Sequence, residues 1–211
     1  KNPMISTKKQ SSLIVWIIFI GLTLIAYTLP WVVGGGVNLT FGAFDLAEWS
    51  SLHPATRAMS PILLTSFLLR FPLVCLAWIV AFNAPSYPFK SASWRVYGLI
   101  CLILVIFSTP PLEFLTTNRD DINYLQQAGL SVIGLMGCGI GLSGVFKPYR
   151  HYVAIGTALI GAIVSIWGAI SAYSLLADFQ ISVSIGIGII ACVGMFIFMA
   201  GYVWLESKRR H

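Results

Sequence analysis

Residues 152–177 read YVAIGTALIGAIVSIWGAISAYSLLA, and no charged side chain interrupts them. A helix that crosses the roughly 30 Å hydrocarbon core of a bilayer needs about 20 predominantly apolar residues. Five other windows of the chain meet or approach that requirement. We therefore predict an all-α fold, a single polytopic transmembrane helical bundle with about six spanning helices. The predicted spans are residues 13–33, 61–82, 96–112, 125–146, 152–177 and 181–205.

The composition of the chain favours hydrocarbon over water as its surroundings. Only 9% of the 211 residues are charged and 57% are hydrophobic, with a mean hydropathy of +0.85. A soluble domain carries roughly 25% charged residues. An apolar surface of this extent is stable only against lipid, so membrane lipids are the first expected partner.

The basic residues predict the orientation of the bundle, because positive charge concentrates on the cytoplasmic side of a membrane. With a cytoplasmic N-terminus, the outer loops contain only Arg57 and Arg119. The inner segments then contain ten of the 13 lysines and arginines: Lys1, Lys8, Lys9, Lys90, Arg95, Lys147, Arg150, Lys208, Arg209 and Arg210. We thus expect both termini in the cytoplasm and a multi-pass protein of the cell membrane. Its compact polytopic form favours a prokaryotic inner membrane. The same distribution explains the net charge of +6, so no nucleic-acid partner is expected.

The longest predicted segment outside the bilayer is the outer loop of residues 34–60. The composition of Phe44–His53 is compatible with a helix, in which Trp49 lies on a broad apolar side interrupted by Asp45. This weak amphipathicity favours a short helix on the outer membrane surface. A single loop histidine such as His53 is typically solvated, so no metal site is predicted. The candidate contact residues of the loop are Asp45, Glu48, Trp49 and His53.

Arg70 is the charged residue that the predicted spans place inside the membrane. A guanidinium at the centre of a spanning helix costs roughly 3 kcal/mol on insertion scales. Pro72 adds a kink, because proline cannot donate the usual backbone hydrogen bond. Two interpretations stay open: Arg70 faces a polar cavity and binds an anion or headgroup, or it forms a structural pair or lies near the surface. Its candidate partners in the chain are Gln126, Gln127 and Glu113.

Small residues recur at four-residue spacing in the last three predicted spans. Such pairs allow two helices to approach closely in a membrane. We expect tight packing among these three helices, and the alternative is that the small faces contact another subunit. The residues concerned are Gly137 with Gly141, Ala158 with Ala162, and Ser184 with Gly188.

The sequence contains none of the common catalytic motifs of membrane enzymes. HExxH, CxxC and P-loop motifs are absent, and no acidic residue lies within a predicted span. Residues 141–144, GLSG, in a six-helix layout resemble rhomboid intramembrane proteases, over these four residues and the helix count alone. That family pairs its serine with a histidine in the sixth helix, and residues 181–205 contain none. Ser143 therefore lacks a base, and no catalytic residue is predicted.

No cofactor is predicted either. The three histidines lie outside the predicted spans, which disfavours a haem or chlorophyll ligated by histidine within the membrane. We expect a non-catalytic integral membrane subunit that packs within a larger complex, with other membrane subunits or with copies of itself. The alternative is a transport component, a permease-like or channel-like bundle in which Arg70 selects an anionic or polar solute.

Overall fold

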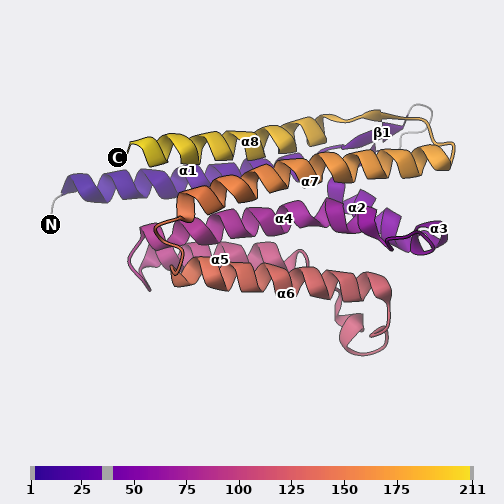
Figure 1. The fold of residues 1–211 in the computed structure, drawn as a ribbon, viewed down its shortest axis with the longest axis horizontal. Coiled ribbons are helices and arrows are strands. Elements are labelled where there is room, and N and C mark those ends of the chain that lie inside the picture. The colour runs from indigo at the N-terminus through magenta and orange to yellow at the C-terminus, as the bar shows by residue number, and fades with distance from the viewer. Residues whose placement is uncertain (1–2, 35–39, 210–211) are drawn as a thin grey trace.

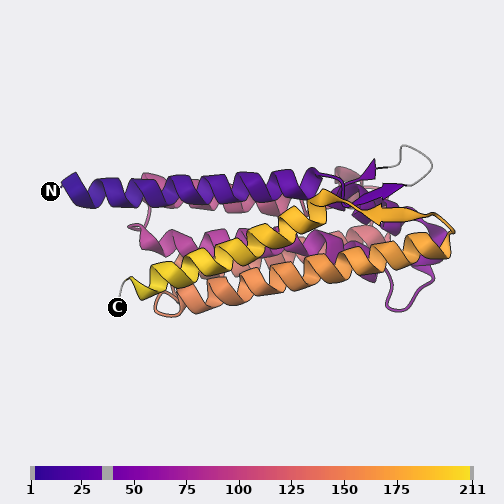
Figure 2. The same cartoon turned by 90° about the horizontal axis from the view of Figure 1, so that it is seen from above.

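A computed structural model describes residues 3–34 and 40–209, with side chains from Leu13 on. Most of the described chain is helical, and the long helices run side by side along one axis (Figures 1 and 2). In chain order the helices are α1 (Pro3–Thr28), α2 (Ala43–Leu52), α3 (Pro54–Arg57), α4 (Leu64–Asn83), α5 (Ala92–Ile106), α6 (Ile122–Ser143), α7 (Arg150–Asp178) and α8 (Ile187–Lys208). Two short 3-10 helices, η1 (Ala84–Ser86) and η2 (Leu112–Leu115), follow α4 and α5. The prediction of a helical bundle is confirmed.

Four helices are long and apolar enough to cross a membrane: α4 together with η1, α6, α7 and α8. They indicate a membrane protein. Two shorter apolar helices accompany them, Leu13–Thr28 and Ala92–Ile106. The 15 residues of α5 extend over about 22 Å, less than a bilayer core, because the helix ends before Pro110 and Pro111.

A small antiparallel sheet closes one end of the bundle, which we call the sheet end. Its strands are β1 (Val32–Gly34), β2 (Thr40–Phe41) and β3 (Val183–Ile185), in the order β2-β1-β3. The strands correct two predicted helix boundaries, since residues 32–33 and 183–185 fall in the first and last predicted spans. Pro30 explains the first correction, because it supplies no backbone N–H to continue α1.

Both ends of the described chain lie at the opposite end of the bundle, which we call the terminal end (Figure 1). The sheet holds the two terminal helices together at their other ends. Val33 pairs with Ser184, and the carbonyls of Pro30 and Trp31 accept the N–H groups of Gly188 and Gly186 at 2.8 and 2.9 Å. The end of α1 is therefore fixed to the start of α8 by backbone hydrogen bonds.

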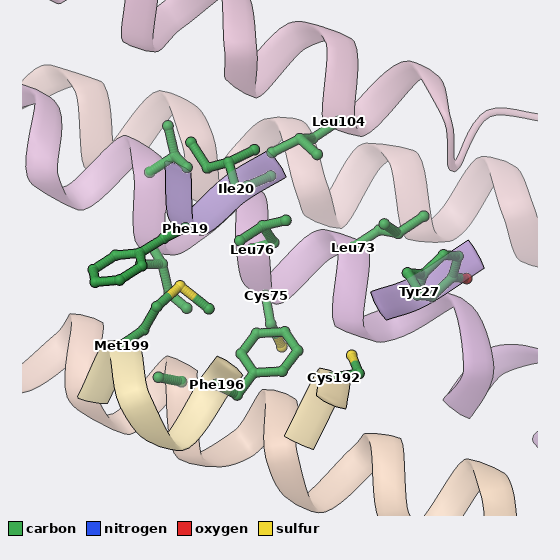
Figure 3. Close-up of a cluster of buried hydrophobic side chains, with 14 of the residues drawn as sticks. Phe19, Ile20, Tyr27, Leu73, Cys75, Leu76, Leu104, Cys192, Phe196 and Met199 are labelled. Atoms are coloured by element: carbon green, nitrogen blue, oxygen red, sulfur yellow. The ribbon is translucent and has the colours of Figure 1, made fainter. Parts of the chain in front are cut away.

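Helix α4 is the centre of the bundle and packs against α2, α5, α6 and α7, whereas α1 packs mainly on α8. In its most apolar window 78% of the residues are buried, against 33% in α6 and in α8 and 39% in α7. Figure 3 shows the core beside it, where Leu73, Cys75 and Leu76 of α4 meet side chains from α1, α5 and α8. The four cysteines are buried and free, as small apolar side chains of this core.

Candidate functional site

Arg70 lies in the second turn of α4, nearer the sheet end than the predicted span placed it, because the helix begins at Leu64 and not at residue 61. Its side chain is 4% exposed. Pro72 lies inside the same helix and cannot donate to the carbonyl of Leu68. A buried cation and an interrupted backbone ladder therefore coincide in one turn.

The guanidinium of Arg70 joins α4 to α6. Its Nη1 donates to the hydroxyl of Ser66, one turn earlier, and to Oδ1 of Asn123 at 3.1 Å. The amide of Gln127 donates to the same oxygen at 3.2 Å. The expected partner Gln127 is thus reached only through Asn123, while Gln126 donates to the carbonyl of Leu63 at 3.0 Å.

Sequence reasoning missed both direct partners of Arg70. Ser66 precedes it by four residues, the spacing that places two side chains on one helix face. Asn123 and Gln127 have the same spacing on α6. The polar pair at the start of α6 was a usable signal, but nothing in the sequence aligned it with Arg70, from which Asn123 is separated by 53 positions.

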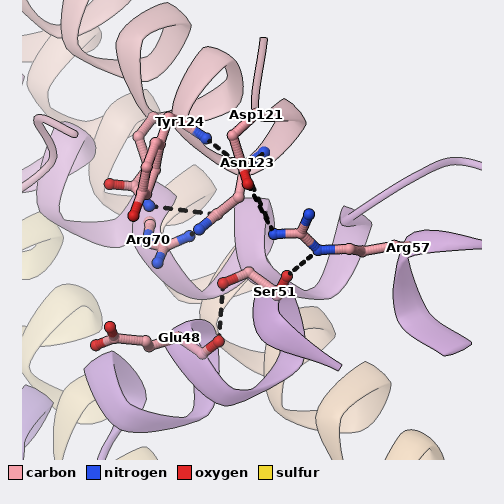
Figure 4. A network of polar contacts seen from close by, with 8 residues as sticks. Glu48, Ser51, Arg57, Arg70, Asp121, Asn123 and Tyr124 are labelled. Carbon is pink, nitrogen blue, oxygen red and sulfur yellow. Dashed lines mark hydrogen bonds and ion pairs between the residues drawn. The ribbon is translucent and has the colours of Figure 1, made fainter. Parts of the chain in front are cut away.

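Three of the five N–H donors of Arg70 are not used within the described chain. Its Nε and Nη2 atoms donate to no described residue, and no described carboxylate lies within ion-pair distance. Glu48 of α2 attracts the guanidinium from further away (Figure 4). Because a buried charge is costly without compensation, these free donors make Arg70 the main candidate for contact with a polar group.

A polar network extends from this site to the short helices. Nη2 of Arg57 in α3 forms an ion pair with Asp121 at 3.1 Å, and Nε donates to the carbonyl of Ser51 at 3.0 Å (Figure 4). Asp121 also caps α6, since its Oδ1 accepts the N–H of Asn123 at 2.8 Å. The network ties the α2–α3 segment to the first turn of α6.

The same contacts lower the pKa of Asp121. Partial desolvation acts in the opposite direction and favours the neutral acid. The N–H group of Asn123 and the guanidinium of Arg57 outweigh it, and hold the pKa of the carboxyl below its usual range. Asp121 therefore stays ionised in mildly acidic solution.

The candidate contacts of the loop lie on α2 and at its end. Oδ2 of Asp45 accepts the N–H of Gly42 at 3.2 Å and caps α2. The ring centroid of His53 lies 4.1 Å from that of Phe179, and the ring of Trp49 contacts both. Among the described residues there is no group of three or more potential metal ligands. The structure thus places Asp45 in a cap and Trp49 and His53 in aromatic contacts, while Glu48 is exposed.

Gly137 and Gly141 of α6 face α4, and not the two helices that follow. A Cβ added at Gly137 would lie 2.0 Å from Nε1 of Trp78, and one at Gly141 would lie 2.8 Å from the Cβ of Ala81. The indole of Trp78 donates to the carbonyl of Gly134 at 3.2 Å. Close packing occurs at these residues, but with α4 as the partner.

The other small residues have different surroundings. Ala158 and Ala162 are buried in α7. Ser184 lies in strand β3, where its hydroxyl donates to the carbonyl of Val33 at 3.2 Å, so it shares no helix face with Gly188. Gly188 packs against the end of α1, where a Cβ would lie 2.5 Å from the carbonyl oxygen of Leu29.

A second buried arginine lies at the terminal end. Arg150 begins α7, is 6% exposed, and donates to the hydroxyl of Ser86 and to Nε2 of His151. The sequence placed it in an inner loop, as one of several basic residues of that side. It contacts Ser86 of η1, which is 64 positions away in the chain, so the sequence gives no local signal of its burial.

The arrangement is that of a helical membrane protein with a buried cationic site near one end of its central helix. No protein-family model matches this chain, and comparison with curated proteins and with solved structures found no match. Its function has to be argued from its own residues.

Proposed function

We propose that the chain crosses the cell membrane six times, with both termini in the cytoplasm, as a non-catalytic subunit of a larger membrane complex. The six spans would be the four long helices together with α1 and α5. Both described chain ends lie at one end of the bundle, as an even number of crossings requires (Figure 1). The basic residues of the connecting segments favour the cytoplasm, in a prokaryotic inner membrane, for that end.

Outward-facing glycines are the observation that best supports a partner subunit. Gly129 and Gly139 of α6 and Gly194 and Gly201 of α8 are exposed, and a Cβ added at any of them would meet nothing within 4 Å. Each glycine costs a helix up to about 1 kcal/mol relative to alanine. The inward glycines recover this cost through close packing, and a helix of another subunit, or of a second copy, would supply the same packing outside.

Purification in mild detergent tests this proposal. We expect other membrane subunits, or a second copy, to co-purify in fixed stoichiometry. Gly139→Leu and Gly194→Leu should reduce that recovery, because the added side chains fill the faces on which a partner helix would pack. Ile140→Leu is the matched control, since it keeps the volume of an exposed side chain next to Gly139.

The variants must keep the thermal stability of the isolated chain, because both sites are open within it. A chain that is monomeric and free of partners in several mild detergents would contradict the proposal. So would partners that both glycine variants retain at full stoichiometry.

A transport component is the second candidate, and the unused Nε and Nη2 donors of Arg70 favour it. In this proposal the guanidinium would bind an anionic or polar solute on its way through the bundle. Chloride and sulfate efflux from liposomes tests it. Arg70→Leu should abolish the flux and the exposed Arg119→Leu should not; the absence of flux in the wild-type protein would exclude both anions as solutes.

A further inference from the structure

A second polar site, which Arg70 does not line, lies at the sheet end between residues 56–65 and the last turns of α7. It is a cavity of about 300 Å³. Ser171, Ser174 and Asp178 face it from α7, at the three- and four-residue spacing of one helix face. The other polar lining residues are Thr56, Ser60 and Thr65. A cavity of this size is at the lower end of the range for small-molecule sites.

The polar side chains of the lining have no hydrogen-bond partner in the part of the chain that the structure describes. Thr56 is 2% exposed, and its hydroxyl has no hydrogen-bond partner among the described residues. The side chains of the other five polar residues form neither a hydrogen bond nor an ion pair with any described residue. Buried hydroxyls in folded proteins are nearly always hydrogen-bonded, so a fully buried one without a partner calls for an explanation.

The charge of the site favours a cation. Asp178 is the charged residue of the lining, and it ends α7, a helix of 29 residues. The C-terminal end of a helix carries partial negative charge and stabilises a cation. Hydroxyl oxygens add neutral acceptors, and Ile170 and Leu175 add apolar wall.

The size of the site distinguishes between cations. A bare Ca²⁺ ion takes six to eight oxygen ligands at about 2.3–2.6 Å, several of them carboxylates, whereas Asp178 is the one carboxylate of this lining and no described group of three potential metal ligands includes it. A primary ammonium donates three hydrogen bonds from one centre and carries an organic substituent that fills the remaining volume.

We propose that this cavity binds a small primary ammonium compound, with Asp178 as counter-ion and acceptors drawn from the hydroxyls of Thr56, Thr65, Ser171 and Ser174. Asp178 is exposed, so the cavity opens at the surface of the sheet end. The ammonium belongs either to a free hydroxylated amine or to an aminophospholipid headgroup. The site is independent of subunit partners and of Arg70.

Binding of ethanolamine to the full chain in detergent, measured by calorimetry, tests the proposal. We expect saturable binding of ethanolamine and none of glycerol, which offers hydroxyls without charge. Asp178→Asn should weaken binding at least about tenfold, the effect of losing one charge-assisted contact. Asp120→Asn is the matched control, because it removes an exposed carboxylate of the same end outside the cavity, and it should leave binding unchanged.

Thr56→Val tests whether the unpaired hydroxyl of Thr56 takes part in binding or is only a destabilising buried group. Without ethanolamine, the variant should melt at a higher temperature than the wild type, because it removes a buried hydroxyl that has no partner. It should also bind ethanolamine several-fold more weakly. A higher melting temperature with unchanged ethanolamine affinity would remove Thr56 from the site and count against the proposal.

Nanodiscs distinguish the two sources of the ammonium. If a headgroup is the ligand, native mass spectrometry should find phosphatidylethanolamine retained over phosphatidylcholine, and Asp178→Asn should abolish the preference. If the free amine is the ligand, calorimetry should show ethanolamine binding and mass spectrometry should show no preference for phosphatidylethanolamine. Neither response, or a saturable response to sodium chloride that equals the one to ethanolamine, would overturn the proposal.

Discussion

Helices α4 and α8 have almost the same length and hydropathy but opposite surroundings. They contain 20 and 22 residues, and the hydropathy of their spans is 2.0 and 2.1. Yet 78% of the apolar window of α4 is buried inside the protein, against 33% for α8. An apolar residue in a bilayer is solvated equally well by protein or by lipid, so hydropathy identifies membrane helices without ranking their position.

Close approach of the neighbours makes α4 the central helix. Ala77 and Ala81 leave room on its surface, and Gly141 of α6 and Gly168 of α7 pack directly on its backbone. On α8, by contrast, large side chains such as Ile190 and Ile197 are exposed. Small residues on both sides of an interface, and not apolar character, therefore distinguish the central helix.

Truncation of a large side chain should give the largest difference in stability between α4 and α8. Leu76→Ala in α4 should lower the free energy of unfolding by about 2–3 kcal/mol, the lower half of the usual range, because lipid also solvates leucine in the unfolded protein. Ile197→Ala on α8 should change it by less than about 0.5 kcal/mol. Unfolding in mixed detergents measures both, and equal losses would contradict the central position of α4.

Two glycines of α6 should respond to alanine with opposite signs. Gly141→Ala should destabilise the protein by about 1–2 kcal/mol, since its Cβ would lie 2.9 Å from the backbone of Ala81. Gly139→Ala faces open space and should stabilise the helix by up to about 1 kcal/mol. Thermal unfolding of the two variants checks the difference, and a destabilising Gly139→Ala would place a close neighbour where the structure has none.

The polar contact between α4 and α6 should contribute less to the free energy of unfolding than the apolar packing does. Asn123→Leu removes the oxygen that accepts from Arg70 and Gln127, and should destabilise the protein by about 1 kcal/mol. In an Arg70→Leu background the same change should have a smaller effect, because the cation is gone. A double-mutant cycle measures the coupling; additive effects would mean that the contact contributes nothing.

The smallest expected effect is a pH dependence at the sheet end. Because the pKa of Asp121 is lowered in the folded protein, its stabilisation is complete above the unfolded value of about 4 and is lost as pH falls through the folded value. The pair with Arg57 has exposed fractions of 35% and 26%, so the loss should stay below about 1 kcal/mol. Thermal melts between pH 6 and pH 3 should show it, and Asp121→Asn, which keeps an N-cap, should remove this part of the slope.

The helical class and the membrane character could be predicted from the sequence, because both follow from contiguous apolar windows. The ends of the helices were harder to predict from the sequence. The first span stopped at Thr28 and the last began at Ile187, since β1 and β3 pair across 151 positions of the chain. The number of spans and the cytoplasmic side of the termini stay predictions.

The candidate site was only half visible in the sequence. Arg70 stood out, because a charge in an apolar window is a local signal. Its partners Ser66 and Asn123, the burial of Arg150 and the unpaired hydroxyl of Thr56 did not stand out. Each depends on which helices touch and at which positions along their length. The packing of small residues between the helices decides that, and hydropathy does not report it. The sequence alone determined that this chain belongs in a bilayer, and only the tertiary structure decided which of its polar groups meet.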